Sequence, residues 1–541
     1  MLKLASIFSD HCVLQRDKII RVFGIADKDT IVEAYILSEG STIAVGETKS
    51  EAISGRFEIK LPELKAATGL KLKVNTAKDE CIFEDIAIGE VWLAGGQSNM
   101  EYELQNATGG KEILANGSTS LVRFYYTPKL AFADEHYDSI HENTKWQLFD
   151  KKASANWSAV GFWYAKELSE RLNVTVGVIG CNWGGTVAFN WISRDYLLNN
   201  DDTKEYVTDY ENSDNFKLSF EEQLSSFKAY EKRMAEWEIK SAKIYEKEPM
   251  IPFDEVQQRI CVCEYPGPMN ECNFTRPYGL YNTMISKIVP YSLGGVIYYQ
   301  GESDDIRADK YDSLLSLLIK QWRDDFKDNK LPFIIVGLPM HRYLHDADNK
   351  SWCIIRANQK KVSAMDENVY FAECIDCGEF HQIHPVEKRK VSHRLFLQAM
   401  SNVYKSNDSE ASRESYIEDI SKNDEGVIIT LPNPVDIRVD KEGIDNYISC
   451  LNAHPDEIKD MHIDIETAYE AILNSQGFEI SDMSGEYYLA DKVLIKDNII
   501  NVSSTMVKEP QKIRYLWKNY FPVFIFSQEG LPLSPFNIDI G

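Results

Sequence analysis

The stretch Ile88-Gly-Glu-Val-Trp-Leu-Ala-Gly-Gly-Gln-Ser98 decides the fold class of this chain. Its first part is an apolar run that ends in two glycines, which is typical of a strand buried on both faces of a sheet. A tight turn after such a strand can expose a hydroxyl at the carboxyl edge of a parallel sheet. Ser98 is therefore a candidate nucleophile, and a Ser that only caps the turn is the competing interpretation.

Apolar runs of the same kind recur along the chain. Residues 174–180, 294–299 and 331–337 predict further buried strands, and helical periodicity over 161–172 and 311–326 predicts helices between them. Strands that alternate with helices imply a parallel sheet covered on both faces. The sequence therefore predicts an α/β core.

Two regions of β type flank this core. Residues 1–88 hold short alternating or β-branched runs separated by Asp, Gly, Ser and Pro, which indicates an all-β domain. The pattern returns over 407–541, where a short helix is predicted near 467–473. A chain of 541 residues is long enough for several domains. We predict three, with the α/β domain over 89–406.

The α/β domain carries a predicted insertion over about 200–275. Within it, residues 215–247 are charged, with Phe, Leu and Tyr at three- and four-residue steps, and this predicts one or two amphipathic helices. Long insertions in α/β enzymes are often functional. The insertion either braces the fold or forms a wall over a substrate cleft.

Composition narrows the classes of partner. The chain has 84 acidic and 59 basic side chains, a formal net charge of -25, and such a field repels phosphate backbones and anionic lipid surfaces. We expect no nucleic-acid or membrane partner, and an uncharged sugar fits this field better than a carboxylate-bearing one. The first residues lack a secretory signal, no apolar run reaches membrane-spanning length, and ten scattered cysteines form no disulfide framework. A cytoplasmic protein with reduced thiols is expected.

Three more segments carry groups that suit acyl transfer. Asn182-Trp-Gly-Gly-Thr186 follows a predicted strand, and its glycines let backbone N–H groups approach a developing oxyanion closely. Tyr299-Gln-Gly-Glu-Ser-Asp304 brings an amide and two carboxylates to the same sheet edge. Gln382-Ile-His-Pro385 supplies an imidazole, the general base that a Ser hydroxyl needs. Together these groups make up an acyl-transfer site.

These four segments resemble the motif blocks of the sialate O-acetylesterase family, within the SGNH hydrolases. Gly-Gln-Ser-Asn-Met100 is similar to the nucleophile block, and the other three segments are similar to the glycine, third and histidine blocks. Flanking runs extend the resemblance over nearly the whole chain. The resemblance implies a flavodoxin-like, three-layer SGNH core and hydrolysis of acetyl esters on sugars or oligosaccharides, without a metal or cofactor.

The same resemblance assigns roles to residues of this sequence. It implies Ser98 as nucleophile and His384 as general base, with an acetyl-enzyme intermediate. The implied oxyanion hole combines the backbone N–H of Ser98, a backbone N–H of Gly184 or Gly185, and the side chain of Gln300. Candidate substrate contacts are Gln97, Asn99, Trp183 and Asp304.

The histidine block departs from the family in one respect. Family members carry an Asp two residues before the His, where this chain has Gln382. Glu302 is the first candidate to orient His384, because it lies beside the proposed oxyanion amide. A Gln382 oxygen that accepts the imidazole N–H and a Ser–His dyad are the alternatives. Weaker carboxylate candidates are Asp304, Asp376 and Glu379.

Other functions compete for the same residues. Without the Asp, the chain could be a glycan-binding protein with impaired turnover. The run Cys374-Ile-Asp-Cys377-Gly-Glu-Phe-His381-Gln-Ile-His384 offers two thiols and two imidazoles for zinc, but the spacing is tighter than in zinc fingers and a metal would occupy His384. Arg276 and Arg356 could meet a substrate carboxylate, although structural arginines are commoner. We therefore favour an esterase without a metal.

Overall fold

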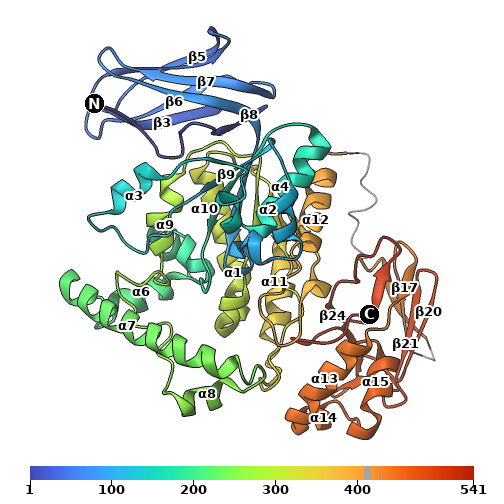
Figure 1. Ribbon diagram of the computed structural model, residues 1–541. Coiled ribbons are helices and arrows are strands. Elements are labelled where there is room, and N and C mark those ends of the chain that lie inside the picture. Colours follow the sequence, from blue (N-terminus) through green and yellow to red (C-terminus); the bar gives the residue numbers. More distant parts are fainter. Residues whose placement is uncertain (407–415, 424–425, 541) are drawn as a thin grey trace.

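A computed structural model describes residues 1–406, 416–423 and 426–540. The architecture is mixed α/β, with one large mixed sheet and several smaller antiparallel sheets (Figure 1). Within the described residues the large sheet has eleven strands. Seven of them follow the order β10-β9-β11-β8-β12-β13-β14. Of the other four, β2 and β7 pair with β8, β4 pairs with β7, and β5 pairs with β4. None of the described helices has the length and apolar character that a bilayer crossing requires.

Strand β8 (Glu80–Gly96) joins the N-terminal sheet to the core. Its first part alternates between exposed and partly buried residues and pairs antiparallel with β7 (Ala67–Asn75). From Ile86 onward every residue is buried, and the strand pairs in parallel with β11 (Val176–Asn182) from Glu90 and with β12 (Gly295–Tyr299) from Trp92. The change of pattern marks the point where both faces become covered. The predicted domain boundary between residues 88 and 89 thus falls inside one continuous strand.

The core of the large sheet is parallel apart from its short edge strand. Strands β11, β12 and β13 are buried at every residue, as expected for strands covered on both faces. The three apolar runs predicted as strands are confirmed, whereas β9 and β14 were not predicted. The remaining strands of this part are β9 (Val122–Tyr126), β10 (Gln147–Leu148), β13 (Phe333–Val336) and β14 (Val369–Ala372).

Helices cover the parallel strands in two packed pairs. Helix α4 (Ala159–Leu172) packs against α12 (Arg389–Gln398), and α10 (Tyr311–Asp325) packs against α11 (Ser351–Met365) (Figure 1). The first pair also contacts strands β9, β11, β13 and β14. The helices predicted over 161–172 and 311–326 are confirmed by α4 and α10.

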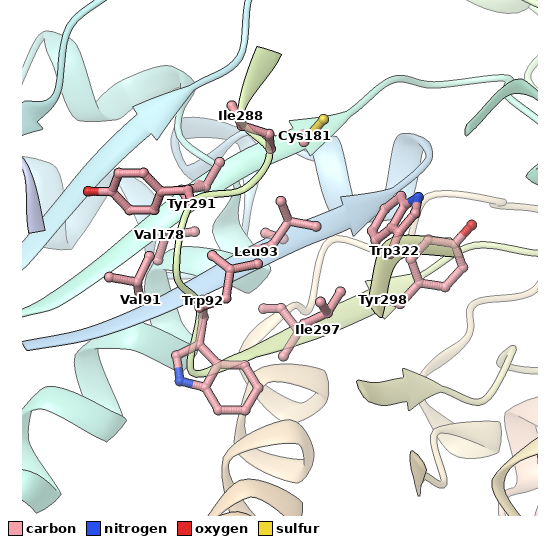
Figure 2. Packing of buried hydrophobic residues seen from close by; sticks show 14 of the residues in the cluster. Val91, Trp92, Leu93, Val178, Cys181, Ile288, Tyr291, Ile297, Tyr298 and Trp322 are labelled. Carbon is pink, nitrogen blue, oxygen red and sulfur yellow. The ribbon is translucent and has the colours of Figure 1, made fainter. Parts of the chain in front are cut away.

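Large buried side chains pack on the parallel strands of the sheet. Trp92 and Leu93 of β8 lie beside Ile297 and Tyr298 of β12 (Figure 2), and all four are fully buried. The Trp322 indole packs edge-on against Tyr298 and donates its N–H to a backbone carbonyl. Burying one such side chain stabilises the fold by roughly 1.5–3 kcal/mol. The packed sheet therefore fixes the position of the turn that follows β8.

The N-terminal region contains strands and turns without a helix over residues 1–79. One antiparallel sheet has the order β1-β3-β6, and a second set of strands pairs antiparallel in the order β5-β4-β7-β8. The strands are β1 (Leu2–Leu4), β2 (Val13–Gln15), β3 (Ile20–Ala26), β4 (Ile31–Ser38), β5 (Ser41–Lys49) and β6 (Arg56–Leu61).

The predicted insertion contains helices α6 (Lys204–Asn212), α7 (Phe220–Tyr245) and α8 (Phe253–Arg259). Helix α7 is one long helix, which confirms the amphipathic prediction for this stretch. It begins with a capping box, in which the hydroxyl of Ser219 and the carboxylate of Glu222 each accept a backbone N–H of the other residue.

The C-terminal region is less purely β than predicted. Helix α15 (Ala468–Ser475) confirms the predicted short helix, but α13 (Lys441–Ala453) and α14 (Pro455–Asp460) were not predicted. The predicted start of this region, at 407, lies outside the described residues. Its strands are β15 (Asp419–Asn423), β16 (Gly426–Thr430), β17 (Val435–Ile437), β18 (Phe478–Ser481), β19 (Tyr487–Leu489), β20 (Lys492–Lys496), β21 (Ile499–Ser503), β22 (Lys512–Tyr515), β23 (Ile525–Ser527) and β24 (Phe536–Asp539).

At Gly96, the last residue of β8, the backbone has room only for glycine. Gly96 has φ +137°, and a Cβ there would lie 2.0 Å from the carbonyl oxygen of Tyr299. We predict that Gly96→Ala lowers the melting temperature by several degrees more than Gly69→Ala, since Gly69 also has positive φ but open space around its Cβ. Thermal unfolding monitored by circular dichroism measures both. Equal shifts would show that the close approach to Tyr299 does not constrain this strand end.

Candidate active site

Ser98 lies at the carboxyl edge of the parallel sheet, directly after β8. It is the first residue of the short helix α1 (Ser98–Glu101), and the preceding residue is held by a hydrogen bond from the Gln97 N–H to the Tyr299 carbonyl (3.0 Å). Ser98 is partly exposed. Within the described chain, neither its hydroxyl nor its backbone N–H has a hydrogen-bond partner. Both groups are therefore available to a ligand.

The glycine turn after β11 lies against Ser98. A Cβ on Gly184 would lie 3.1 Å from the Ser98 Cβ, so the two backbones approach as closely as a glycine permits. The Gly184 N–H donates to a carboxylate oxygen of Glu101 (2.5 Å), and that carboxylate also pairs with Lys129. One of the two glycine N–H groups predicted for the oxyanion hole is thus occupied by a side chain of helix α1.

Gly185 is the other predicted oxyanion donor, and its N–H has no partner among the described residues. Its carbonyl accepts a hydrogen bond from the Tyr265 hydroxyl (3.1 Å), which comes from the segment after α8. Next to the glycines, Trp183 stacks on Phe274 with ring centroids 4.7 Å apart and stays partly exposed. The insertion therefore reaches the edge of the site, as the wall interpretation of this segment expected.

Asn99 joins three motif blocks through its side-chain amide. Its Nδ2 donates to Glu302 Oε1 (2.7 Å) and to the carbonyl of Ile383 (3.0 Å), and its Oδ1 accepts from Lys388 Nζ (2.6 Å). Because Ile383 precedes His384, the turn that carries Ser98 and the histidine block are bonded to each other. Asn99 is only 1% exposed. The structure gives it a positioning role and does not support the predicted substrate contact.

A second buried hydrogen-bond network joins Gln97, Gln300 and Asp304. Gln300 Nε2 donates to Asp304 (2.5 Å) and to Gln97 Oε1 (3.2 Å), and Gln300 is fully buried. Asp304 also accepts the backbone N–H of Ala188 (3.0 Å), and burial raises the pKa of this carboxyl to about 7. The Gln300 amide is turned to protein partners, so the structure does not support it as an oxyanion donor. Nor does it support substrate contacts by Gln97 and Asp304.

The predicted orienting acid does not reach His384. Glu302 bonds to Asn99, its second oxygen has no partner in the described chain, and no hydrogen bond joins it to the imidazole. Gln382 Oε1 accepts the backbone N–H of His384 (3.2 Å) instead of the ring N–H. Asp376 is paired with Arg394. The described structure therefore contains no carboxylate bonded to His384, and no hydrogen bond joins His384 to Ser98.

The surroundings of His384 favour the neutral form of its ring. Burial lowers the pKa of His384, the ammonium of Lys388 lowers it further, and the carboxylate of Glu101 acts in the opposite direction. A neutral imidazole is the form that can accept a proton from a hydroxyl. Glu101 was not predicted from the sequence, although its position three residues after Ser98 places it one helical turn away.

Two arginines considered for a substrate carboxylate are structural. The Arg276 guanidinium donates to the carbonyl of Ala131 (2.7 Å), and Arg356 donates to the carbonyl of Lys518 (2.5 Å). Both side chains are buried. Each donates to backbone oxygens, and the Arg356 Nε, which has no partner among the described residues, is itself buried, as is typical of structural arginines.

The zinc alternative finds no support. Over the part of the chain that the structure describes, no three His, Cys, Asp or Glu side chains are grouped to hold a metal ion. Cys374 and Cys377 are buried free thiols, and the Cys377 sulfur accepts a hydrogen bond from Arg394 (3.4 Å). Arg394 would place a positive charge beside any metal bound here.

The chain is similar in sequence to known proteins. A family model described as "Carbohydrate esterase, sialic acid-specific acetylesterase" matches residues 263–396, a range that includes the third and histidine blocks. The sialate O-acetylesterase of Mus musculus is 24% identical over 435 residues, covering 74% of this chain and 73% of that protein. The resemblance to the sialate O-acetylesterase family is confirmed. The Homo sapiens member of this family is 23% identical, covering 74% of this chain and 71% of its own.

One solved structure is similar along the whole chain. A carbohydrate acetylesterase from Xanthomonas citri superposes with a TM-score of 0.71, covering 99% of both chains at 23% sequence identity. The two chains therefore share a fold. The N-terminal strands, the α/β core and the C-terminal region are all part of that common architecture.

The charges around His384 lead to a prediction about pH. Since only the neutral ring accepts a proton, kcat/KM for a chromogenic acetate ester should rise with pH, with a midpoint below the ordinary histidine pKa of 6.5. Glu101→Gln removes the carboxylate that favours the protonated ring, so its midpoint should move to lower pH. The control is Glu112→Gln, the same change at an exposed position of helix α2 (Gly110–Asn116). A midpoint that rises in Glu101→Gln would contradict this assignment.

Proposed function

We propose that the protein is a carbohydrate O-acetylesterase in which Ser98 attacks the acetyl ester and His384 acts as general base. The observation that carries the proposal is the Asn99 amide, whose bond to the Ile383 carbonyl (3.0 Å) holds the histidine block against the nucleophile turn. The free hydroxyl of Ser98 and the neutral ring of His384 are the two groups that acyl transfer requires.

The proposed reaction has two halves. Ser98 Oγ bonds to the ester carbon while His384 takes its proton, and the ring then gives that proton to the sugar oxygen as the ester C–O bond breaks. Water next attacks the acetyl-enzyme, with His384 taking its proton and returning it to Ser98 as acetate leaves. The backbone N–H groups of Ser98 and Gly185 stabilise the oxyanion, and Gly184 joins them if Glu101 moves aside.

The comparisons support the chemistry in its general form. The curated relatives are named sialate O-acetylesterases, and the solved structure of similar fold is described as a carbohydrate acetylesterase. Both names describe removal of acetyl groups from sugars. We extend that activity to this chain because the four motif blocks occur in the same order and two of them lie within the matched family range.

The proposal includes a Ser–His dyad in place of a triad. With Gln382 where the family has Asp, the carboxylate of Glu101 is the acid that acts electrostatically on His384. We also retain three expectations with the proposal: an SGNH-type three-layer core, the division near residues 88 and 406, and a cytoplasmic location.

Replacement of the nucleophile tests the proposal. Ser98→Ala should lower acetate release from acetylated oligosaccharides by roughly a thousand-fold or more, as removal of a serine nucleophile does in hydrolases. Ser120→Ala, at an exposed position away from the site, should match the wild type. Acetate is measured by a coupled enzymatic assay. Full activity in Ser98→Ala would refute the nucleophile, and an inactive wild type that still binds the sugars would instead indicate a glycan-binding protein.

A further inference from the structure

The insertion contacts the glycine turn through Tyr265. The Tyr265 hydroxyl donates to the carbonyl of Gly185 (3.1 Å), and a Cβ on Gly185 would lie only 2.5 Å from the same hydroxyl oxygen. The Gly184 N–H is occupied by Glu101, so Gly185 carries the glycine N–H that remains for an oxyanion. A residue of the insertion therefore bonds directly to the residue that carries a proposed oxyanion donor.

The backbone at Gly185 depends on its partners for its conformation. Its φ is +73°, and a glycine populates positive and negative φ about equally, so the residue alone does not fix the direction of its N–H. The two ends of the turn are bonded elsewhere: the Trp183 N–H donates to the Gly96 carbonyl (3.2 Å), and the Thr186 hydroxyl donates to the Trp183 carbonyl (2.7 Å). Tyr265 supplies the hydrogen bond to Gly185 itself.

Helix α7 holds the strap, the segment 261–268 that carries the tyrosine. The Arg233 guanidinium donates to both carboxylate oxygens of Glu264, with Nε–Oε1 and Nη2–Oε2 distances of 2.8 and 2.6 Å. Trp237, one turn later on α7, donates its indole N–H to the carbonyl of Cys261 (3.0 Å). These bonds attach the strap to a long helix on the N-terminal side of its tyrosine.

The strap is also fixed on the C-terminal side of its tyrosine. Asn273 is fully buried, and its Nδ2 donates to the carbonyls of Pro266 (2.8 Å) and Pro268 (3.2 Å). Gly267 lies against Tyr230 of α7, where a Cβ would be 2.5 Å from the ring. A buried amide whose two donors are paired fixes the backbone that it bonds. The strap therefore presents its tyrosine from a defined backbone position.

The Tyr265 side chain contributes little to the stability of the fold. The residue is 53% exposed, although the backbone on each side of it is anchored. A hydrogen bond such as the one it makes is worth only about 0.5–1.5 kcal/mol to stability. An aromatic side chain that is half exposed, anchored at its base and bonded at its tip to the glycine turn serves the geometry of that turn more than the stability of the protein.

We propose that Tyr265 is a positioning residue, which holds Gly185 so that its N–H is directed at the oxyanion. The inference rests on the proposed acetylesterase function and gives the insertion a role in it. When Ser98 Oγ bonds to the ester carbon, the electron pair of the C=O bond moves to the oxygen, and this negative oxygen accepts the Gly185 N–H. Donors that are already in place stabilise the charge without reorganisation. Tyr265 touches neither the ester carbon nor its oxygen and acts only through Gly185.

The first test removes the Tyr265 hydroxyl alone. Tyr265→Phe keeps the ring, and it should lower kcat for acetate release about ten-fold and leave KM within about two-fold, because the interaction acts on the transition state. A chromogenic acetate ester and the best acetylated oligosaccharide should lose the same factor, since both form the same oxyanion. The control Tyr245→Phe changes a partly exposed tyrosine of α7 whose hydroxyl bonds to no described residue, and it should match the wild type. An unchanged kcat in Tyr265→Phe, or a loss in KM alone, would overturn the inference.

The second test measures stabilisation of the oxyanion with methylboronic acid. Its boron accepts an electron pair from Ser98 Oγ, the hydroxyl proton passes to His384, and the tetrahedral adduct carries the negative charge of the transition state. The inhibition constant should rise in Tyr265→Phe by the same factor as kcat falls, about ten-fold, and stay unchanged in Tyr245→Phe. An unchanged inhibition constant beside a lowered kcat would show that Tyr265 acts elsewhere and would also overturn the inference.

Two controls separate the possible failures. The melting temperature of Tyr265→Phe should lie within about 2 °C of the wild type, because one exposed hydrogen bond is lost, and the kinetic losses then do not come from unfolding. A wild-type protein that neither releases acetate nor binds methylboronic acid in calorimetry would refute the proposed function, and this inference with it. An active wild type with an equally active Tyr265→Phe would leave the proposed function standing and refute only the role of Tyr265.

Discussion

The whole arrangement depends on one buried amide, that of Asn99. Its three hydrogen bonds reach Glu302, Ile383 and Lys388, which belong to segments about 200 and 290 residues further along the chain. An amide buried this fully is costly unless each group is paired, so the pairing fixes its orientation and the positions of its partners. The turn that carries Ser98, the third block and the histidine block are therefore held as one unit.

Strand β8 places that unit at the carboxyl edge of the parallel sheet. Strand β8 passes from an alternating burial pattern to full burial within its own length and ends at Gly96, where the backbone needs space beside Tyr299. Parallel neighbours on both sides bring the glycine turn and Gln300 to the same edge. The position of Ser98 thus follows from sheet topology, and the buried surroundings of His384 lower the pKa of its ring.

Much of this arrangement could be predicted from the sequence, because periodicity and turn residues are local signals. The strand before Ser98, the helices α4 and α10, and the long helix of the insertion all carry apolar patterns of the expected period. Two C-terminal helices were missed, although Ile444, Tyr447 and Leu451 are buried at helical spacing in α13. There the surrounding strand-rich pattern dominated the interpretation.

The contacts of polar side chains were less predictable than the elements that carry them. Motif order correctly placed Gln300 and Glu302 at the site edge, but which atom each would bond depends on three-dimensional packing. Both were expected to face the reaction, and both instead serve buried partners, while Glu101 was not singled out. Residue type and spacing show which groups can be near a site, and only the structure shows which of their donors and acceptors are left free.

The central claim is that the Ser98 hydroxyl becomes acetylated during turnover. The most direct measurement is mass spectrometry of the intact protein and its peptides after rapid acid quenching of a reaction with a chromogenic acetate ester. The account predicts one acetyl group on the peptide that contains Ser98, and its absence in Ser98→Ala. An acetyl group on a different residue that turns over at the catalytic rate, or turnover with no acetylated protein at any time, would contradict it.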